Sequence, residues 1–337
     1  MIFSSAINRI LIIKLRAIGD VVLSTAVIEN LRAQFPNATI DFLTERFASD
    51  AVAGNPHLNS VVTFHKASES SLSLIQKIRK GNYNLVIDLF CNPRTALITF
   101  LSGAKYRIGY SFRGRRYAYN VLVTPRSGEV HNVEFNVDAL RKLEIPIVTT
   151  NPVFFLSEDE KHFAREWKNS LHTEQNKIIV GLNTGGGWYT KKWKLEYFAA
   201  LADMIVERHH AEIVLFWGPG EKDDVLHVQS LMKHRSHIIP KTTLKQMGAL
   251  LQECNYIITN DSGPMHIAAT LGVPTLGIFG PTNPHLQGPY GSKNEWVRNE
   301  ELDCLGCNYT SCPINNVCMK DLSVTIVLQS FEKLVAK

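Results

Sequence analysis

The chain has 337 residues, of which 45% are hydrophobic and 20% charged, a composition typical of an ordinary globular protein with two domains. Its formal net charge of +5 favours an anionic ligand over wholesale nucleic-acid binding. No apolar run reaches the roughly 20 residues that span a bilayer, and the run 10–13 is too short for a signal peptide. We therefore expect a cytoplasmic protein.

The first half of the chain alternates short apolar runs with amphipathic segments. Residues 10–15, 38–44, 60–64 and 84–90 are β-rich and apolar, and residues 21–35 have the spacing of a helix. Strands that alternate with helices in this way predict parallel βαβ units.

The same alternation starts again near residue 177. Strands are expected at 177–183 and 212–218, with a helix at 195–208 between them, and two more strands at "NYIITN" and "TLGIFG". The repeat predicts an α/β protein with two Rossmann-like, doubly wound parallel sheets.

The segment 156–171 has helical spacing and lies near the domain boundary. We expect an N-terminal domain over 1–165, a C-terminal domain over 166–320 and a final helix over 321–337, with Ser323 as its N-cap. In open α/β sheets ligands bind at the carboxyl ends of the strands, so the residues there are the candidates for function.

The stretch "NDSGPMHIAA" (260–269) joins the end of a strand to a helix. Asp261 ends the strand, Ser262 can cap the helix, and Gly263 permits close approach of a ligand. The N–H groups of such a helix start bind anions, and His266 would add a donor. The alternative is a well-capped helix with a surface histidine and a carboxylate that stabilises the helix dipole.

The stretch "NTGGGWYTKKWKLEYF" (183–198) follows another strand. Thr184 and Gly185 present donors there, and Lys191 can neutralise a leaving diphosphate. Neither a Walker A nor a G-x-G-x-x-G pattern occurs. The alternative is a solvated lysine run before a helix, and Trp193 is expected in the core.

Two carboxylates follow strands elsewhere. Glu221, after "GPG", can accept hydrogen bonds from a ribose diol, or else it is an ordinary acid at a helix start. Asp20, in "KLRAIGDVVLSTAV", is the candidate general base, although the pattern equally fits an N-cap aspartate.

Residues 105–126 hold six basic residues and five aromatics but no acid. Such a segment can bind nucleic acid, anionic lipid or a phosphorylated glycan, or it can be a solvated loop. Because the rest of the chain is only mildly basic, we favour a local anionic acceptor.

Four cysteines lie close together near the end of the chain, whereas Cys91 and Cys254 sit in apolar segments and are expected in the core. The cluster fits a structural zinc better than disulfides in a cytoplasmic chain, and a reduced cluster without metal is the alternative. The cluster comprises Cys304, Cys307, Cys312 and Cys318.

The motifs "ILIIKLRAIGDVVLSTAVIENLR", "GGGWYTKKWKLEYFAAL", "GPGEKD" and "NDSGPMHIAATLGVPTLGIFGPTNP" resemble, in order and spacing, those of glycosyltransferase family 9, the ADP-heptose:lipopolysaccharide heptosyltransferases. The resemblance implies a GT-B fold, two Rossmann-like domains that face a cleft. It places the acceptor in the N-terminal domain and the nucleotide sugar in the C-terminal one. It also implies inverting, metal-independent catalysis and a terminal helix that packs back on the first domain.

The resemblance also assigns roles to individual residues. Asp20 would be the catalytic base and Lys191 the residue on the leaving diphosphate. Glu221 would hold the ribose and Thr242 would line the adenine pocket. The other donor-binding residues would be Thr184, Gly185, Asp261, Ser262, Gly263 and His266. For the acceptor, charge and position predict Lys14, Arg16, Arg113, Arg115 and Arg116.

The expected function is therefore transfer of heptose from ADP-heptose to the inner core of lipopolysaccharide, on Kdo-lipid A or heptosyl-Kdo-lipid A. No cofactor is required, because the Asp-x-Asp pattern of metal-dependent glycosyltransferases is absent. We expect a monomer on the cytoplasmic face of the inner membrane, in peripheral contact with it and without nucleic acid. The alternatives are another sugar or acceptor, a nucleotide-sugar epimerase, and a non-catalytic binding protein.

Overall fold

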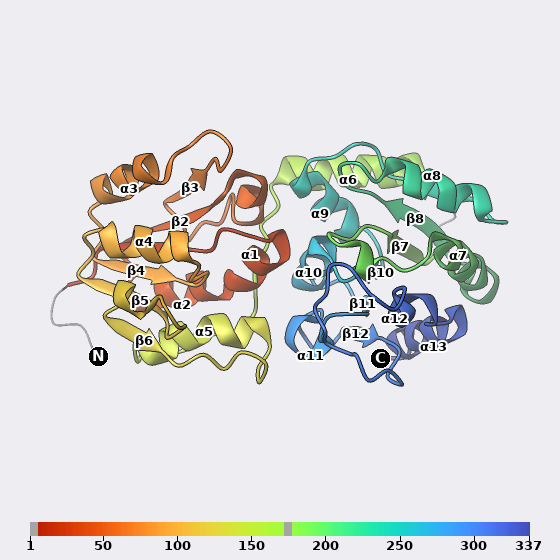
Figure 1. Cartoon of the computed structure of the whole chain (residues 1–337). Coiled ribbons are helices and arrows are strands. Elements are labelled where there is room, and N and C mark those ends of the chain that lie inside the picture. Colours follow the sequence, from red (N-terminus) through yellow and green to blue (C-terminus); the bar gives the residue numbers. More distant parts are fainter. Residues whose placement is uncertain (1–5, 172–176) are drawn as a thin grey trace. The chain divides into compact units, whose positions relative to one another are not determined.

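The computed structural model describes residues 6–171 and 177–337. It divides into two compact units, Met1–Phe155 and Leu156–Lys337, and each unit is built around one six-stranded sheet (Figure 1). Every pair of neighbouring strands in both sheets runs parallel. The predicted α/β class with two doubly wound sheets is confirmed.

In the first unit the strand order is β3-β2-β1-β4-β5-β6. The chain starts in the middle of the sheet, builds outward to β3, and then crosses to the other side of β1. The strands are β1 (Arg9–Ile13), β2 (Thr39–Glu45), β3 (Ser60–Phe64), β4 (Leu85–Asp88), β5 (Tyr106–Tyr110) and β6 (Val121–Val123).

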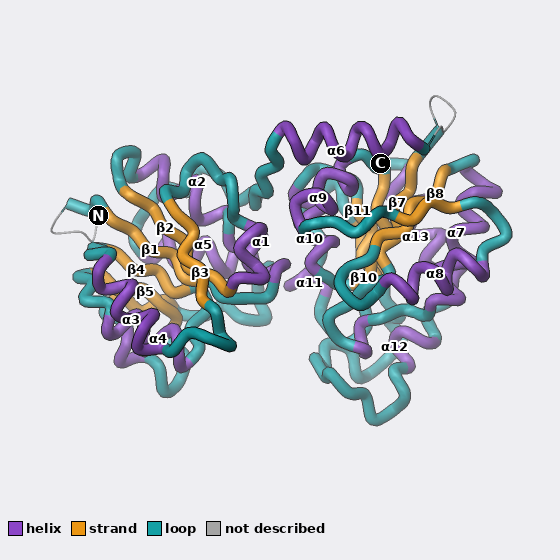
Figure 2. Tube along the Cα trace, turned by 90° about the horizontal axis from the view of Figure 1, so that it is seen from above, coloured by secondary structure: helices purple, strands orange, loops and turns teal. Residues whose placement is uncertain are grey.

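Helices cover both faces of this sheet, as the tube trace shows (Figure 2). α3 and α4 lie side by side on one face, and α1, α2 and α5 pack together. Their bounds are α1 (Ile18–Ser24), α2 (Ala26–Gln34), α3 (Ser71–Lys80), α4 (Pro93–Leu101) and α5 (Asn132–Lys142), with 3-10 turns η1 (Arg46–Ala51) and η2 (Arg116–Ala118).

The second unit repeats this topology with the order β12-β11-β10-β7-β8-β9. Its strands are β7 (Ile179–Asn183), β8 (Glu212–Phe216), β9 (Ser236–Ile238), β10 (Tyr256–Asn260), β11 (Thr275–Ile278) and β12 (Glu295–Val297). Its helices are α6 (Glu158–Ser170), α7 (Leu195–His209), α8 (Lys222–Leu231), α9 (Leu244–Gln252), α10 (Gly263–Thr270), α11 (Pro284–Gln287), α12 (Val317–Lys320) and α13 (Val324–Val335), with the 3-10 turn η3 (Tyr189–Lys191).

The apolar runs of the sequence become strands that are buried on both faces. Residues 10–13 of β1 have no exposed surface, because helices pack on each side of the sheet. Cys91 and Cys254 are buried as expected. Trp193 is buried too, and its indole N–H donates to the Leu322 carbonyl at 2.9 Å. The core predictions are thus confirmed.

Two helices lie differently from the expectation. The division falls after Phe155 rather than after residue 165, because α6 packs along α9 and belongs wholly to the second unit. The final helix, α13, packs on α7, β11 and β12, so it is part of the second unit and not a separate element placed on the first. Ser323 does cap it, accepting from the Ile326 N–H at 3.4 Å.

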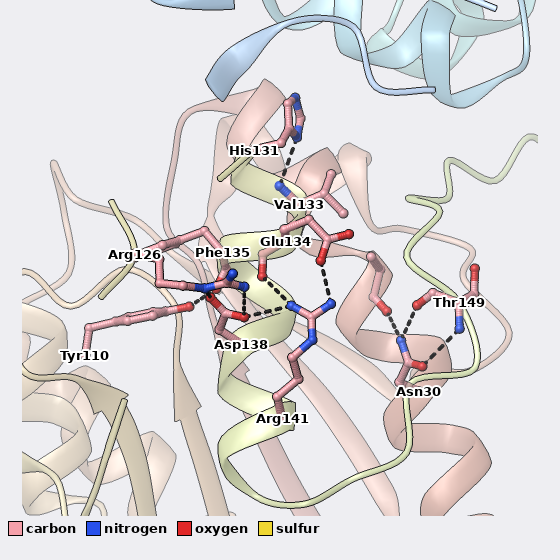
Figure 3. Close-up of polar contacts among 11 residues, drawn as sticks. Asn30, Tyr110, Arg126, His131, Val133, Glu134, Phe135, Asp138, Arg141 and Thr149 are labelled. Atoms are coloured by element: carbon pink, nitrogen blue, oxygen red, sulfur yellow. Dashed lines mark hydrogen bonds and ion pairs between the residues drawn. The ribbon is translucent and has the colours of Figure 1, made fainter. Parts of the chain in front are cut away.

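In the first unit, α5 is held by a charged network (Figure 3). Asp138 accepts from Arg126 and Arg141, and Arg141 also pairs with Glu134. Burial acts to raise the pKa of Asp138, but the hydrogen bonds from the two arginines outweigh it and lower that pKa. Arg126 is therefore fully engaged with α5.

Candidate functional site

Two asparagine side chains join the loops at the carboxyl ends of β7 and β10. These strands are neighbours, so residues that follow them meet at one edge of the sheet. The Asn183 amide donates to Thr259 Oγ1 at 3.0 Å and to Ser262 Oγ at 3.1 Å. The Asn260 amide donates to the Thr184 carbonyl at 2.7 Å. The sheet edge is thus a fixed, polar platform.

A lysine, an aspartate and a threonine meet on this platform. Lys191 Nζ lies 2.6 Å from Asp261 Oδ2, and the Thr282 hydroxyl donates to the same oxygen at 2.6 Å. The pair is largely shielded, with side-chain exposures of 14% for Lys191 and 5% for Asp261. Lys191 Nζ also lies 4.6 Å from the centre of the Trp188 ring. The ammonium group is therefore anchored and poorly hydrated.

Helix α10 begins beside this cluster. Pro264 lies in the first turn, and His266 is buried, which excludes the alternative of a surface histidine. Ser262 stands at the N-cap position, but its hydroxyl makes no capping bond, because it meets Asn183 and Thr259 instead. The predicted capping role of Ser262 is thus wrong. The N–H groups of the first turn are left without a side-chain cap from Ser262, as an anion site requires.

Glu221 organises the glycine-rich loop. Its Oε1 accepts from the Gly186 N–H at 3.2 Å and its Oε2 from the Gly218 N–H at 3.0 Å. A Cβ on Gly185 would lie 2.3 Å from Glu221 Oε2, so any larger residue there would displace the Glu221 carboxylate. Each carboxylate oxygen keeps a second lone pair that can accept from a ligand hydroxyl.

The two predicted threonines lie at strand ends of the same unit. Thr184, directly after β7, is fully buried, and its hydroxyl has no hydrogen-bond partner in the described part of the chain. Thr242 follows β9 and precedes Thr243, the N-cap of α9. With β9 beside β8, Thr242 lies at the same sheet edge as Glu221.

Asp20 lies in the first turn of α1, which follows β1 in the first unit. Its Oδ2 accepts from the Ala17 N–H at 3.1 Å, as in a capping box. Oδ1 accepts no hydrogen bond from residues 6–171 or 177–337, and the side chain is half-buried. One oxygen thus has a structural role at the helix start, and the other is available to a proton donor.

Two predicted acceptor residues precede Asp20. Lys14 is buried, and its Nζ donates to the Leu89 carbonyl at 3.2 Å. Arg16 is exposed and lies 3.9 Å from Glu45. Lys14 is therefore tied to the end of β4, and Arg16 is the more accessible cation of the two.

The basic loop of the first unit includes the turn η2, which packs against α4. Arg113 is exposed, and Arg115 stacks on the Phe112 ring at 5.6 Å. Arg116 is exposed and donates to the Ser111 carbonyl at 3.1 Å. The structure keeps these three charges within one short loop of the unit that carries Asp20.

The four C-terminal cysteines all have free thiols. Burial, followed by the neighbouring Cys304, Cys312 and Cys307, raises the pKa of the Cys318 thiol to about 11. Over the described ranges, no three His, Cys, Asp or Glu side chains are placed to hold a metal ion. A structural zinc therefore stays a prediction from spacing alone.

Three polar residues of the platform were absent from the predicted site. Asn183 and Asn260 end their strands, where position alone could have indicated them. Thr282 follows β11 in "GPTNP", and its contact with Asp261 depends on the order of strands in the sheet. The sequence feature that could have indicated Thr282 is its place after β11, at the same edge of the sheet as Asp261.

The second unit thus presents an anchored cation, a helix start and a carboxylate with spare acceptor capacity at one edge of a doubly wound sheet. This edge is the place where α/β proteins bind nucleotides. The arrangement can bind a diphosphate at Lys191 and α10, and a diol at Glu221.

The family model of glycosyltransferase family 9 (heptosyltransferase) matches residues 71–318, and the chain belongs to this family. It is 25% identical to lipooligosaccharide heptosyltransferase 2 of Campylobacter jejuni, over 94% of this chain and 95% of that one. A family 9 glycosyltransferase from Veillonella parvula has a TM-score of 0.85 at 25% identity, covering 98% of this chain and 97% of that one. The E. coli ADP-heptose LPS heptosyltransferase II shares the fold, with a TM-score of 0.77 at 21% identity, covering 97% and 98%. The predicted GT-B fold is thereby confirmed.

Proposed function

We propose that this chain transfers heptose from ADP-heptose to the inner core of lipopolysaccharide, with Kdo-lipid A or heptosyl-Kdo-lipid A as acceptor. The observation that carries the proposal is the Lys191 ammonium, held 2.6 Å from Asp261 beside the start of α10. The names of the relatives support heptose as the sugar and a lipopolysaccharide as the acceptor.

The second unit would bind the donor. The diphosphate would lie against the first turn of α10, with Ser262, Gly263 and His266 around it and Lys191 on its outer oxygens. The ribose hydroxyls would donate to Glu221, and the adenine would lie near Thr242. The unpartnered Thr184 hydroxyl supports this placement, since a bound ligand would supply its missing partner.

The first unit would supply the base. Asp20 takes the proton of an acceptor hydroxyl while that oxygen attacks the anomeric carbon of heptose. The bond from this carbon to the β-phosphate oxygen breaks, and ADP leaves with the electron pair. A single displacement of this kind inverts the anomeric configuration.

Lys191 and the N–H groups of α10 would stabilise the charge that develops on ADP, so the transfer would proceed without a divalent metal. Lys191 has three N–H donors, and Asp261, itself held by the Thr282 hydroxyl, fixes the position of Lys191 while leaving donors for phosphate oxygens. Preorganised cations of this kind cost little reorganisation during the reaction.

The acceptor is a lipid, and we propose that the protein works as a monomer at the cytoplasmic face of the inner membrane. Among the described residues, no helix has both the length and the apolar character needed to cross a bilayer. Lys14, Arg16, Arg113, Arg115 and Arg116 would bind the anionic groups of the acceptor.

The test is transfer from ADP-heptose to a panel of truncated lipopolysaccharide cores, with EDTA present and the products identified by mass spectrometry. The proposal predicts addition of one heptose to one core and release of ADP. Transfer to no core, or conversion of the nucleotide sugar without an acceptor, would contradict it. The second result would favour an epimerase.

A further inference from the structure

Helix α4 of the first unit exposes two large apolar side chains. Leu97 and Phe100, which are 40% and 45% exposed, lie three residues apart and so share one side of the helix. The buried side consists of Ala96 and Ile98 together with Thr95 and Thr99. A helix between a protein core and water usually carries polar residues on its outer side, so this exposed apolar pair is a candidate contact surface.

The exposed face of α4 continues into a neighbouring turn. Tyr117 of η2 is 56% exposed, and its ring lies edge-on to that of Phe100, with 5.6 Å between the centres. Helix α3 packs on the other side of α4, as both ribbon views show (Figures 1 and 2). We call Leu97, Phe100 and Tyr117 the apolar stripe.

The segment of the chain that carries the apolar stripe has exposed charges of one sign. Residues 71–126 contain ten of the 36 basic residues of the chain but one of its 31 acids. That acid, Asp88, is fully buried and adds nothing to the surface. The basic residues are Lys77, Arg79, Lys80, Arg94, Lys105, Arg107, Arg113, Arg115, Arg116 and Arg126.

Several of these cations lack an acidic partner. Arg126 pairs with Asp138, and the Arg107 guanidinium donates to the Ala104 and Ala118 carbonyls. Lys77 and Lys80, at the end of α3, are exposed and form no ion pair with the residues that the structure describes. The surface beside α4 therefore carries uncompensated positive charge.

We propose that the apolar stripe and its basic surroundings dock the first unit on the surface of an anionic lipid bilayer. Leu97, Phe100 and Tyr117 enter the headgroup region, and the lysines and arginines face lipid phosphates. Nucleic acid would satisfy the charges but not an exposed leucine. The inference rests on the proposed function in one respect, that the acceptor is itself a membrane lipid.

The test is sedimentation of the full chain with vesicles that contain neither acceptor nor donor. The wild type should pellet with vesicles of phosphatidylethanolamine and phosphatidylglycerol, and much less with phosphatidylcholine vesicles. Leu97→Gln/Phe100→Gln should reduce partitioning about tenfold or more, because two apolar side chains leave the interface. Both side chains are exposed, so the fold should persist, and an unchanged circular dichroism spectrum checks this.

The matched control is Leu226→Gln/Leu231→Gln on α8 of the second unit, where the leucines are 44% and 43% exposed. It removes similar apolar surface and should leave partitioning unchanged. Lys77→Gln/Lys80→Gln should weaken binding severalfold per lysine and flatten its salt dependence. The proposal would be overturned if the wild type did not bind phosphatidylglycerol vesicles or pelleted without lipid. Equal binding by the wild type and the Leu97→Gln/Phe100→Gln variant would also overturn it.

Vesicle binding and sugar transfer can fail separately. If the chain binds vesicles through α4 but transfers heptose to no core, the docking surface stands and the proposed function falls. If it transfers heptose to a delipidated core but ignores vesicles, the docking surface is wrong and the proposed function stands.

Discussion

A buried aspartate occupies the corresponding place in each unit. Asp88 ends β4 in the first unit, and Asp261 directly follows β10 in the second; each strand is the fourth of its unit and pairs with the first. Both side chains lie at the carboxyl edge of a parallel sheet. They differ in the groups that meet them.

Asp88 is surrounded by its own unit's neutral donors. Its Oδ1 accepts from the Phe90 and Cys91 N–H groups at 3.0 and 2.8 Å, and its Oδ2 accepts from the Tyr119 hydroxyl at 2.9 Å. Burial raises its pKa, and these hydrogen bonds offset only part of the rise. The hydrogen bonds to Asp88 at the end of β4 therefore all come from the protein itself.

Asp261 instead meets a cation. Lys191 and Thr282 share its Oδ2, and the start of α10 lies next to it. The same topology thus places an aspartate among neutral donors in the first unit and beside a cation in the second. The comparison indicates that the strand-end position alone does not define a site; the cation opposite the carboxylate does.

Among the residues at the two strand ends, the largest effect is expected at Lys191. Lys191→Met should lower kcat about 10²–10³-fold, as when one preorganised charge on a developing anion is lost. Lys192→Met is the control, because Lys192 also pairs with a carboxylate, Asp224 at 3.1 Å. Steady-state kinetics should show a much smaller effect for it. Equal losses of kcat in the two variants would contradict a specific role of Lys191 in transfer.

Exchanging each aspartate for asparagine tests the comparison directly. Asp261→Asn should destabilise the protein by roughly 3 kcal/mol and reduce transfer, because it leaves the shielded Lys191 charge without its partner. Asp88→Asn should retain donor affinity, since its donors are neutral. Urea unfolding and ADP binding measure the two effects. Loss of ADP binding in Asp88→Asn would contradict the distinction.

The pH dependence of stability should report on the burial of Asp88. The folded pKa of Asp88 lies above its unfolded value of about 4, so the folded state holds more protons between these two pKa values. Its contribution is therefore present below pH 4 and is lost as the pH rises through the folded pKa. Relative to Asp88→Asn, the wild type should lose stability from pH 4 upward. A difference in unfolding free energy between the wild type and Asp88→Asn that does not change with pH would refute this.

The smallest effects are expected from the hydroxyl groups. Tyr119→Phe and Thr282→Val each remove one donor to a buried aspartate. Tyr119→Phe should cost about 1–3 kcal/mol of stability and leave the donor KM unchanged. Thr282→Val should raise the donor KM by about tenfold or less. The reverse pattern would mean that the functional strand end lies in the first unit.

Much of this arrangement could be predicted from the sequence. The strand at 60–64 was placed where β3 lies. Asp261 and Glu221 became candidates because they follow apolar runs, Lys191 because it lies beside a glycine-rich loop, and the family resemblance supplied their roles. The structure brings Lys191 and Asp261 together, while the roles stay predictions. Local signals suffice for such residues, since a strand's end and its hydrophobic pattern lie in one short stretch of sequence.

Other features depend on contacts between distant residues. Ser262 fits an N-cap by sequence, but Asn183, 79 positions away, takes its hydroxyl. Asp88 looked like part of an apolar strand, and one of the donors that satisfy it in the folded chain is Tyr119, 31 positions away. The expectation that α13 packs on the first domain came from the family resemblance, whereas its own amphipathic pattern shows that the helix packs but not on what. Strand order and side-chain partners are properties of the folded chain.

We propose that the second unit binds the donor and that Asp20 of the first unit removes the proton. The most direct test is Asp20→Asn, whose amide oxygen can still accept from the Ala17 N–H but whose side chain cannot act as a base. We predict unchanged affinity for ADP and a loss of heptose transfer of about 10²–10⁴-fold. Transfer at the wild-type rate, or a parallel loss of ADP binding, would contradict the division of roles between the two units.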